Sequence, residues 1–169
     1  PSDVIDLAGV AELSGVDASA GTLTVKSMTS HSAVAGNSDV VSTIPALASL
    51  AGGIGDPHVR NRGTIGGSVA NNDPAADYPA ALLGLDATVT TVRREVSAEK
   101  FFVGMFETGL EEGELISSIR FKIPDTAAYV KFPNPASRYA IVGVMVAKFQ
   151  ERIRVAVTGA GPSVFRVPE

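Results

Sequence analysis

A glycine-rich stretch at residues 60–77 constrains what this chain can fold into more than any other part of it. The stretch is RNRGTIGGSVANNDPAAD, in which two arginines precede a glycine-rich turn and two aspartates follow the turn. Glycine lets the backbone approach a ligand closely and adopt positive φ without strain. Successive free N–H groups in such a turn attract anions, phosphate above all. Nearby carboxylates suit the hydroxyl groups of a ribose, so the stretch indicates a nucleotide-phosphate site.

The same stretch also has a purely structural interpretation. A tight turn needs glycine where φ is positive, and the two aspartates can cap the helix that we expect to begin near Tyr78. Two standard phosphate motifs are missing from the sequence: G-x-x-x-x-G-K-[ST], and a G-x-G-x-x-G that opens a helix after a strand. ATP and nicotinamide sites of those two types are therefore not indicated. The residues alone leave the functional and the structural interpretation open.

The composition excludes several kinds of site. The chain has no cysteine and only two histidines, so it lacks the ligands of an iron–sulfur cluster or a cysteine-based zinc site. We expect no metal of its own. The net charge of −4 gives no basic face, so a nucleic-acid partner is not indicated. No window approaches the roughly 18 consecutive apolar residues of a membrane span. No acid–base or nucleophilic arrangement stands out, so we assign no catalytic residue, and a cofactor would supply any chemistry.

The hydrophobic patterns predict a mixture of helices and strands. The expected helices are 31–35, 45–51 and 78–85, and the expected strands are 4–7, 22–26, 87–92, 114–124, 139–149 and 153–158. The glycine-rich stretch is expected to be a loop, with residues 68–70 strand-like. The irregular order of the elements favours an α+β fold over a doubly wound sheet. The character of the sequence changes after Pro124, which predicts a boundary near residues 124–128.

Several side chains outside the glycine-rich stretch are candidates with ordinary alternatives. His31 is expected in the first turn of a helix, and His58 in a solvated loop. Three phenylalanines are expected in the core rather than against a ligand: Phe101, Phe102 and Phe106. Three residues near a proline-rich loop can face a ligand or belong to ordinary surface: Lys131, Arg138 and Tyr139.

Residues 52–67, GGIGDPHVRNRGTIGG, and the segment that follows to Asp77 resemble the FAD-binding medium subunit of molybdenum hydroxylases. The likeness is strongest to the aerobic carbon monoxide dehydrogenase type, and xanthine dehydrogenase carries the same domain. Segments 4–7, 101–104, 110–116 and 131–132 fit as well, so the resemblance covers the whole chain. It implies an α+β fold with two parts. Residues 1–125 would be the second subdomain of a PCMH-type FAD-binding domain, and residues 126–169 would begin an antiparallel-sheet C-terminal domain.

The resemblance also implies which residues bind the cofactor. In that family the T-I-G-G turn and the residue after it wrap the pyrophosphate and ribityl region of FAD; here these are Thr64, Ile65, Gly66, Gly67 and Ser68. Polar contacts to FAD would come from Asn71, Asp73 and Asp77. Ile116 falls on an apolar position near the flavin and Lys131 on a polar position close by. Many relatives have histidine where Asn71 stands. The resemblance implies no catalytic residue and no metal ligand in this chain.

The function implied is that of an electron-transfer flavoprotein subunit in a cytoplasmic oxidoreductase complex. A large subunit with the molybdenum cofactor would oxidise the substrate, and a small subunit with [2Fe–2S] clusters would relay the electrons. FAD would pass them to quinone, NAD or oxygen. The substrate and the acceptor cannot be inferred from this chain.

The resemblance further implies that the chain is an internal fragment. Such subunits have an earlier glycine-rich loop of the A-G-G-x-S type, which forms the other half of the pyrophosphate site, and this sequence does not contain it. We therefore expect the chain by itself to bind FAD weakly or not at all and to be inactive. One alternative is therefore an assembly domain that holds no FAD. A separate alternative is an unrelated phosphate-binding domain.

Overall fold

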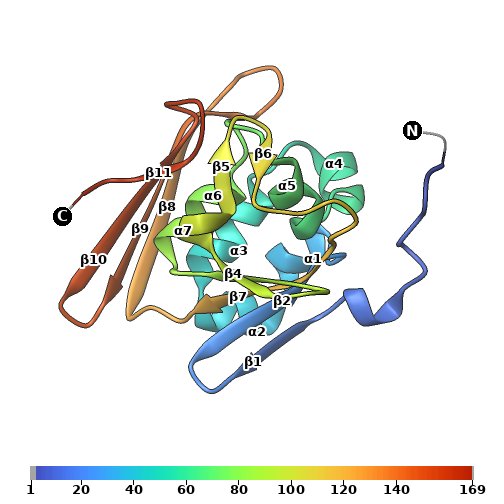
Figure 1. Cartoon of the computed structure of the whole chain (residues 1–169). Helices are drawn as coiled ribbons and strands as arrows, with labels where there is room; N and C mark the ends of the chain where they lie inside the picture. The colour runs from blue at the N-terminus through green and yellow to red at the C-terminus, as the bar shows by residue number, and fades with distance from the viewer. Residues whose placement is uncertain (1–2, 169) are drawn as a thin grey trace.

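A computed structural model describes residues 3–168 and shows two antiparallel sheets joined through a group of short helices (Figure 1). The first sheet has five strands in the order β1-β2-β7-β3-β4: Val16–Ser19, Thr22–Lys26, Ile116–Lys122, Thr88–Thr91 and Glu95–Ser97. The second has four in the order β11-β10-β9-β8: Phe165–Arg166, Arg152–Thr158, Ala140–Phe149 and Thr126–Pro133. Strands β5 (Phe102–Gly104) and β6 (Glu107–Thr108) form a small separate pair. The antiparallel sheets and separate helices confirm the α+β expectation.

The helices are short, and most of them begin at a polar side chain. They are α1 (His31–Gly36), α2 (Ser38–Thr43), α3 (Pro45–Gly52), α4 (Pro57–Arg62), α5 (Ile65–Asn71), α6 (Tyr78–Gly84) and α7 (Ala98–Phe101), after a single 3-10 turn, η1 (Ala11–Leu13). Four of them start at a residue whose side chain accepts a backbone N–H bond from the first turn: Ser30, Asn37, Asp56 and Thr64. Each such cap stabilises a helix by about 1 kcal/mol. This explains how so many short helices form between residues 31 and 71.

The sequence-based expectations for the elements are partly confirmed and partly wrong. The helices expected at 31–35, 45–51 and 78–85 are α1, α3 and α6. The expected strand at 4–7 is wrong: Val4 and Ile5 are 88% and 82% exposed, and this segment pairs with no strand of residues 3–168. The glycine-rich stretch is helical in α4 and α5 rather than a loop, and residues 68–70 lie inside α5. The sequence-based analysis also missed strand β8.

Helix α6 lies at the centre of the molecule and is buried on every side. All its residues from Tyr78 to Gly84 are buried. Gly84 permits the contact with the second sheet, because a Cβ there would lie 2.6 Å from Cγ of Met145 in β9. The core that surrounds α6 includes Phe101 and Phe121, so it joins the helices to the first sheet as well.

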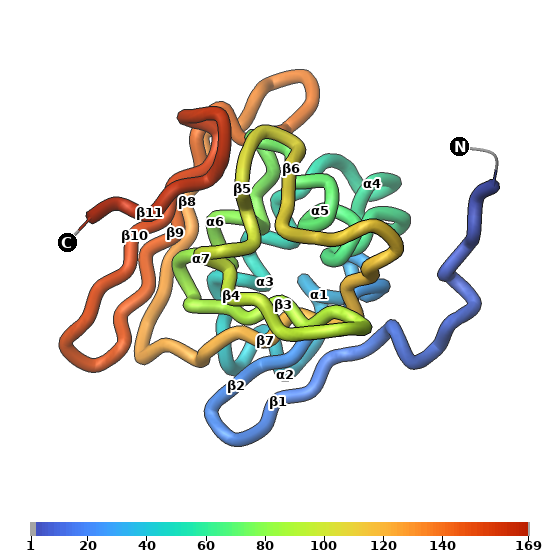
Figure 2. Tube along the Cα trace, viewed as in Figure 1, coloured from blue at the N-terminus to red at the C-terminus, as the bar shows by residue number. Residues whose placement is uncertain are grey.

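The two sheets are joined by one short connection, which the Cα trace makes easy to follow (Figure 2). Strand β7 ends at Lys122 in the first sheet, and β8 begins at Thr126 in the second. Helices α3 and α6 pack against strands of the second sheet, and they share a single core with the first. The division into a domain at 1–125 and another at 126–169 stays a prediction.

Candidate cofactor-binding site

A cavity of about 520 Å³ opens where α1, α4 and α5 meet the loops that precede α6 and β9. Six of the expected contact residues line it: Thr64, Gly67, Ser68, Asn71, Asp73 and Asp77. The cavity therefore brings together residues of the glycine-rich stretch that are up to thirteen positions apart in the sequence. The helical form of the stretch explains this, because α5 carries Ser68 and Asn71 on one face, about one turn apart.

The backbone N–H groups at the start of α5 are not free to bind a phosphate. The N–H of Ile65 donates to the carbonyl of Thr29 at 3.1 Å, and that of Gly66 donates to the carbonyl of Ser27 at 2.8 Å. The N–H of Gly67 donates to Oγ1 of Thr64 at 3.1 Å. The expectation of a turn with free N–H groups is therefore wrong. Thr64 and Ser68 both line the cavity, so their hydroxyls are the donors of this turn that are available to a ligand there.

The glycines of the turn serve close packing rather than an unusual backbone conformation. Gly63, Gly66 and Gly67 are absent from the glycines that have positive φ among the described residues. A Cβ at Gly66 would lie 2.5 Å from Cβ of Ser27, and one at Gly63 would lie 2.5 Å from Nε2 of His31. Ile65 is fully buried in the core. Ile65 and Gly66 thus fix the position of α5 and do not line the cavity.

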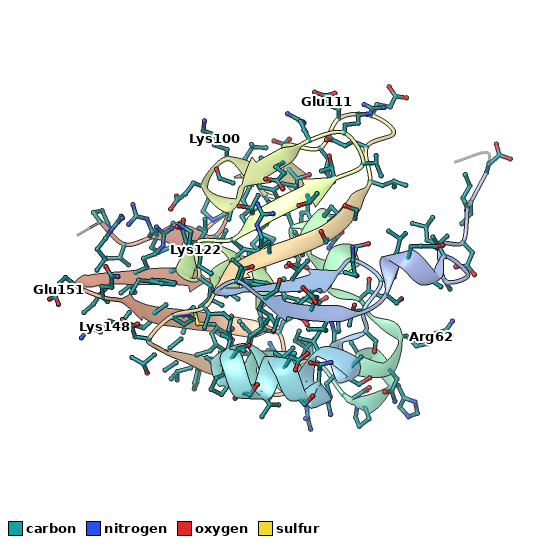
Figure 3. The ribbon with its side chains drawn as sticks, turned by 90° about the horizontal axis from the view of Figure 1, so that it is seen from below. Arg62, Lys100, Glu111, Lys122, Lys148 and Glu151 are labelled. Carbon is teal, nitrogen blue, oxygen red and sulfur yellow. The ribbon has the colours of Figure 1, made fainter. Side chains whose placement is uncertain are left out.

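The two arginines that lead into the turn have different roles. The guanidinium of Arg60 donates to the carbonyls of Ile54 and Gly55 at 3.0 and 2.8 Å, which fastens the loop before α4. Arg62 lines the cavity together with Arg138 from the loop before β9. Within residues 3–168 neither Arg62 nor Arg138 has a hydrogen-bond or ion-pair partner for its guanidinium. Figure 3 shows the side chain of Arg62 extending outward from the ribbon. Two unpaired guanidinium groups on one cavity fit the charge of a diphosphate.

Asp77 also lines the cavity, and its carboxylate is held by strand β8. The hydroxyl of Tyr129 donates to Oδ1 of Asp77 at 2.5 Å, and Nζ of Lys131 donates to Oδ2 at 3.0 Å. Lys131 also donates to the carbonyl of Gly53 at 3.0 Å. Burial raises the pKa of Asp77, while the hydrogen bond from Tyr129 and the charge of Lys131 oppose that rise. Asp77 precedes α6, but its side chain makes no capping bond there, so the expected helix cap is wrong.

Two further expected contact residues, Lys131 and Ile116, lie outside this cavity, whereas Asp73 lies on it. Lys131 lines a neighbouring cavity of about 420 Å³, and it reaches the larger one through its ion pair with Asp77. Ile116 is buried in β7 and is absent from the residues that line the larger cavity. Asp73 lines the cavity but already accepts a bond from the N–H of Ala75 at 2.8 Å. Contacts of all these residues with a cofactor stay predictions.

Two polar residues of this region were not among the expected cofactor contacts, although His31 was a candidate. His31 lines the cavity although it is 4% exposed, and its ring lies 5.4 Å from that of Tyr78. Burial and the charge of Arg60 lower the pKa of His31 to about 4, so its imidazole is neutral at pH 7. Tyr129 was missed because β8 was missed. The signal was present in the sequence, since residues two positions apart in a strand share a face and Lys131 was already a candidate.

Metal-ligand clusters and membrane-spanning helices are both absent from the described part of the chain. No group of three or more potential metal ligands comes together within residues 3–168. In the same residues no helix has the length and apolar character needed to cross a membrane.

Comparison with known proteins identifies the family. The model for the FAD binding domain in molybdopterin dehydrogenase matches residues 1–125. The carbon monoxide dehydrogenase medium chain of Hydrogenophaga pseudoflava is 33% identical over 180 residues, which cover 98% of this chain and 62% of the relative. The glyceraldehyde dehydrogenase medium chain of Sulfolobus acidocaldarius is also 33% identical over 180 residues, covering 100% of this chain and 64% of the relative. The nicotine 6-hydroxylase medium subunit of Paenarthrobacter nicotinovorans is 32% identical, covering 100% and 63%.

Solved structures agree with these sequence matches. The carbon monoxide dehydrogenase of H. pseudoflava that lacks the Mo-pyranopterin moiety of its cofactor has a TM-score of 0.89 at 32% identity, over 95% of this chain and 60% of that one. Quinoline 2-oxidoreductase from Pseudomonas putida 86 has a TM-score of 0.91 at 29% identity, over 98% and 62%. The chain spans less than two thirds of the length of these relatives. The resemblance found in the sequence is thus confirmed, and the chain belongs to the family of FAD binding domains in molybdopterin dehydrogenases.

Proposed function

We propose that the larger cavity is the FAD site and that the chain is the flavin-holding, electron-transfer part of a molybdenum hydroxylase complex. The observation that carries this proposal is the pair of unpaired guanidinium groups, Arg62 and Arg138, on a cavity lined by the residues expected to contact FAD. Family membership names the ligand. When bound, FAD supplies a group that accepts two electrons and can release them singly.

Different residues of the chain would then bind different parts of the cofactor. Arg62 and Arg138 would pair with the diphosphate, and the hydroxyls of Thr64 and Ser68 would donate to the same part of the molecule. Asn71, Asp73 and Asp77 would accept hydrogen bonds from its hydroxyl groups. The neutral imidazole of His31 adds no charge to the cavity at pH 7. The wall that Asp77 forms is nearly closed to solvent, since Asp77 is 4% exposed.

The partners in this proposal are a large subunit with the molybdenum cofactor and a small subunit with [2Fe–2S] clusters. The names of the relatives support separate subunits, because they are called medium chains or medium subunits. These 169 residues contain no cysteine, so iron–sulfur clusters would have to be held outside them. The relatives are about equally similar, yet their names refer to carbon monoxide, glyceraldehyde and nicotine. We infer that the substrate is chosen outside the matched region. The cytoplasmic location stays a prediction.

Titration with FAD, followed by flavin fluorescence, tests the proposal. The longest form of the subunit that the native gene encodes should bind FAD with micromolar or tighter affinity. The present chain should bind about a thousandfold more weakly, because two or three charge-assisted hydrogen bonds of about 1.5–3 kcal/mol each would be missing with the first glycine-rich loop. Micromolar binding by the present chain would contradict that second expectation.

Competition separates the two alternatives from the proposal. AMP and inorganic phosphate should displace FAD only weakly if the site is built for the whole dinucleotide. Phosphate or AMP binding as tight as that of FAD would support an unrelated phosphate-binding domain. Failure of the longest form to bind FAD would support an assembly domain without cofactor and would overturn the proposal.

A further inference from the structure

The side chain of Tyr129 lies against Gly143, a residue of the neighbouring strand that is diagonal to it in the second sheet. Lys131 in β8 pairs in register with Gly143 in β9, and the ring of Tyr129 extends over that glycine. A Cβ at Gly143 would lie 2.2 Å from the hydroxyl oxygen of Tyr129 and 3.0 Å from its Cζ. Any side chain at Gly143 would therefore move the phenol, so the glycine creates the space in which the hydroxyl reaches Asp77.

The hydroxyl of Tyr129 has one partner, and that partner lines the cavity. It donates to Oδ1 of Asp77 at 2.5 Å, while Lys131 occupies Oδ2 at 3.0 Å. A carboxylate can accept about four hydrogen bonds in all, so Asp77 keeps acceptor capacity besides its bonds with Tyr129, Lys131 and its own backbone. Because Tyr129 and Lys131 are two positions apart in one strand, β8 fixes both oxygens at once. The carboxylate is thereby prevented from rotating.

We propose that Tyr129 is a positioning residue for the cofactor: its hydroxyl orients the Asp77 carboxylate so that it accepts a hydrogen bond from a hydroxyl or N–H group of bound FAD. This inference rests on the proposed function of the cavity. Tyr129 acts through Asp77 and does not line the larger cavity itself. A preoriented acceptor binds more tightly because less freedom is lost when the ligand arrives.

The charged groups around Asp77 determine how the hydrogen bond between Tyr129 and Asp77 depends on pH. The ionisable groups that face this carboxylate or line the same cavity are Tyr129, Lys131, Tyr78, Arg138, Tyr139, Arg62, His31 and Asp73. Burial and the charge of Asp77 raise the pKa of Tyr129, so its hydroxyl keeps its proton and remains a donor. Burial raises the pKa of Asp77, and the hydrogen bond from Tyr129 opposes that rise. Loss of the hydroxyl therefore raises the pKa of Asp77 further.

The test is the pH profile of FAD affinity for Tyr129→Phe, in the longest form of the subunit that the native gene encodes. Protonation of Asp77 removes the charged acceptor, so affinity falls on the acid side. In Tyr129→Phe that fall should move to higher pH by about one to two units, the equivalent of one charge-assisted hydrogen bond. At the pH of the wild-type midpoint, binding should be about fivefold to fiftyfold weaker than in the wild type, because a shift of one to two units leaves that much less of the ionised carboxylate. The matched control is Tyr78→Phe, which removes a buried hydroxyl that has no hydrogen-bond partner among residues 3–168; it should shift the profile much less than Tyr129→Phe does.

Gly143→Ala gives an independent variant. Its Cβ displaces the hydroxyl of Tyr129, so it should shift the pH profile in the same direction. In a Tyr129→Phe background the contact at 2.2 Å no longer exists, so adding Gly143→Ala should shift the profile little further. Additive shifts would show that the two residues act separately and would overturn the inference.

A measurement on the wild-type protein keeps the inference testable if a variant does not fold. The Asp77 carboxyl can be titrated by NMR with ¹³C-labelled aspartate, with and without FAD. FAD should lower the pKa of Asp77, because a donor from the ligand stabilises the carboxylate. An unchanged pKa, or an unchanged affinity profile for Tyr129→Phe, overturns the inference and leaves the proposed FAD site intact. Absence of FAD binding to the wild type overturns both.

Discussion

The guanidinium of Arg154 in β10 donates two hydrogen bonds to the carbonyl oxygen of Leu83 in the last turn of α6, at 3.1 and 2.9 Å. The last carbonyls of a helix have no partner within it, so this contact supplies one from the second sheet. Arg154 also forms ion pairs with Glu99 at 2.7 Å and with Asp86 at 3.4 Å. Its side chain is 8% exposed. One side chain thus joins the central helix to the second sheet.

Replacing Arg154 with alanine should therefore destabilise the fold. The change removes the two good hydrogen bonds to the buried carbonyl of Leu83, which keeps only weaker backbone contacts from Leu85 and Asp86. It also removes two ion pairs, and the total cost is about 3 kcal/mol. Urea unfolding followed by circular dichroism measures this loss. The control is Arg152→Ala, at an exposed position in the same strand, which should change the free energy of unfolding by less than about 0.5 kcal/mol. Equal effects of the two changes would contradict the role of Arg154.

Gly66→Ala should be costly because the added methyl group has no space. Its Cβ would lie 2.5 Å from Cβ of Ser27 and 2.7 Å from the backbone oxygen of Ser27. Overpacking against backbone costs about 1–3 kcal/mol, and the shift of α5 should also weaken FAD binding. Gly36→Ala is the matched control, since it is also helical and nothing lies within 4 Å of its added Cβ. That variant should be neutral or more stable by up to about 1 kcal/mol. Comparing the thermal unfolding of the two variants separates the cost of overpacking from the general effect of replacing a helical glycine by alanine.

His31 should make the protein less stable in acid. Its pKa is about 4 in the fold and 6.5 in the unfolded chain, lowered by burial and by the charge of Arg60. The unfolded chain therefore binds a proton first, so the contribution of His31 is complete above pH 6.5 and is lost as the pH falls toward 4. His31→Gln should flatten the dependence of the unfolding free energy on pH in that window. His58→Gln, at an exposed position of α4, should leave the dependence as in the wild type.

Removal of the unpaired cations should weaken FAD binding. Arg62→Ala and Arg138→Ala should each weaken binding by about tenfold to a hundredfold, because each removes a charge-assisted contact of about 1.5–3 kcal/mol with the diphosphate. The loss should shrink at high salt, which screens exposed charges. Lys148→Ala is the control: this lysine lies in the second sheet, well away from Arg62 (Figure 3). A loss of affinity as large for Lys148→Ala would indicate a general effect of net charge.

The sequence predicted the strongly patterned elements well. The run from Tyr78 to Leu85 and the alternation after Tyr139 have clear periods, and the structure has α6 and β9 there. Strand β8 was missed because the sequence TAAYVKFP ends in proline and is flanked by turn residues. Its place in the sheet depends on pairing with β9, which local pattern does not reveal.

The candidate site was predicted in part, for a physical reason that concerns the glycines. Glycine-rich sequence was interpreted as exposed turn backbone, whereas Gly63 and Gly66 allow contact with His31 and Ser27. The sequence shows that these positions have no side chain, but it does not show which neighbouring residue packs so closely that a side chain would not fit. The partners of Asp77 were likewise hidden, because Tyr129 lies 52 positions away along the chain.

The attachment of Asp77 to β8 sets the smallest piece that can be exchanged between related flavoproteins. A chimera joined between β7 and β8, at the end of the region matched by the family model, would give Asp77 donors from a different parent. Residues corresponding to Tyr129, Lys131 and Gly143 would then have to come with it. A chimera that keeps these contacts must therefore include the chain as far as the end of β9. That segment extends beyond the residues that match the FAD binding domain.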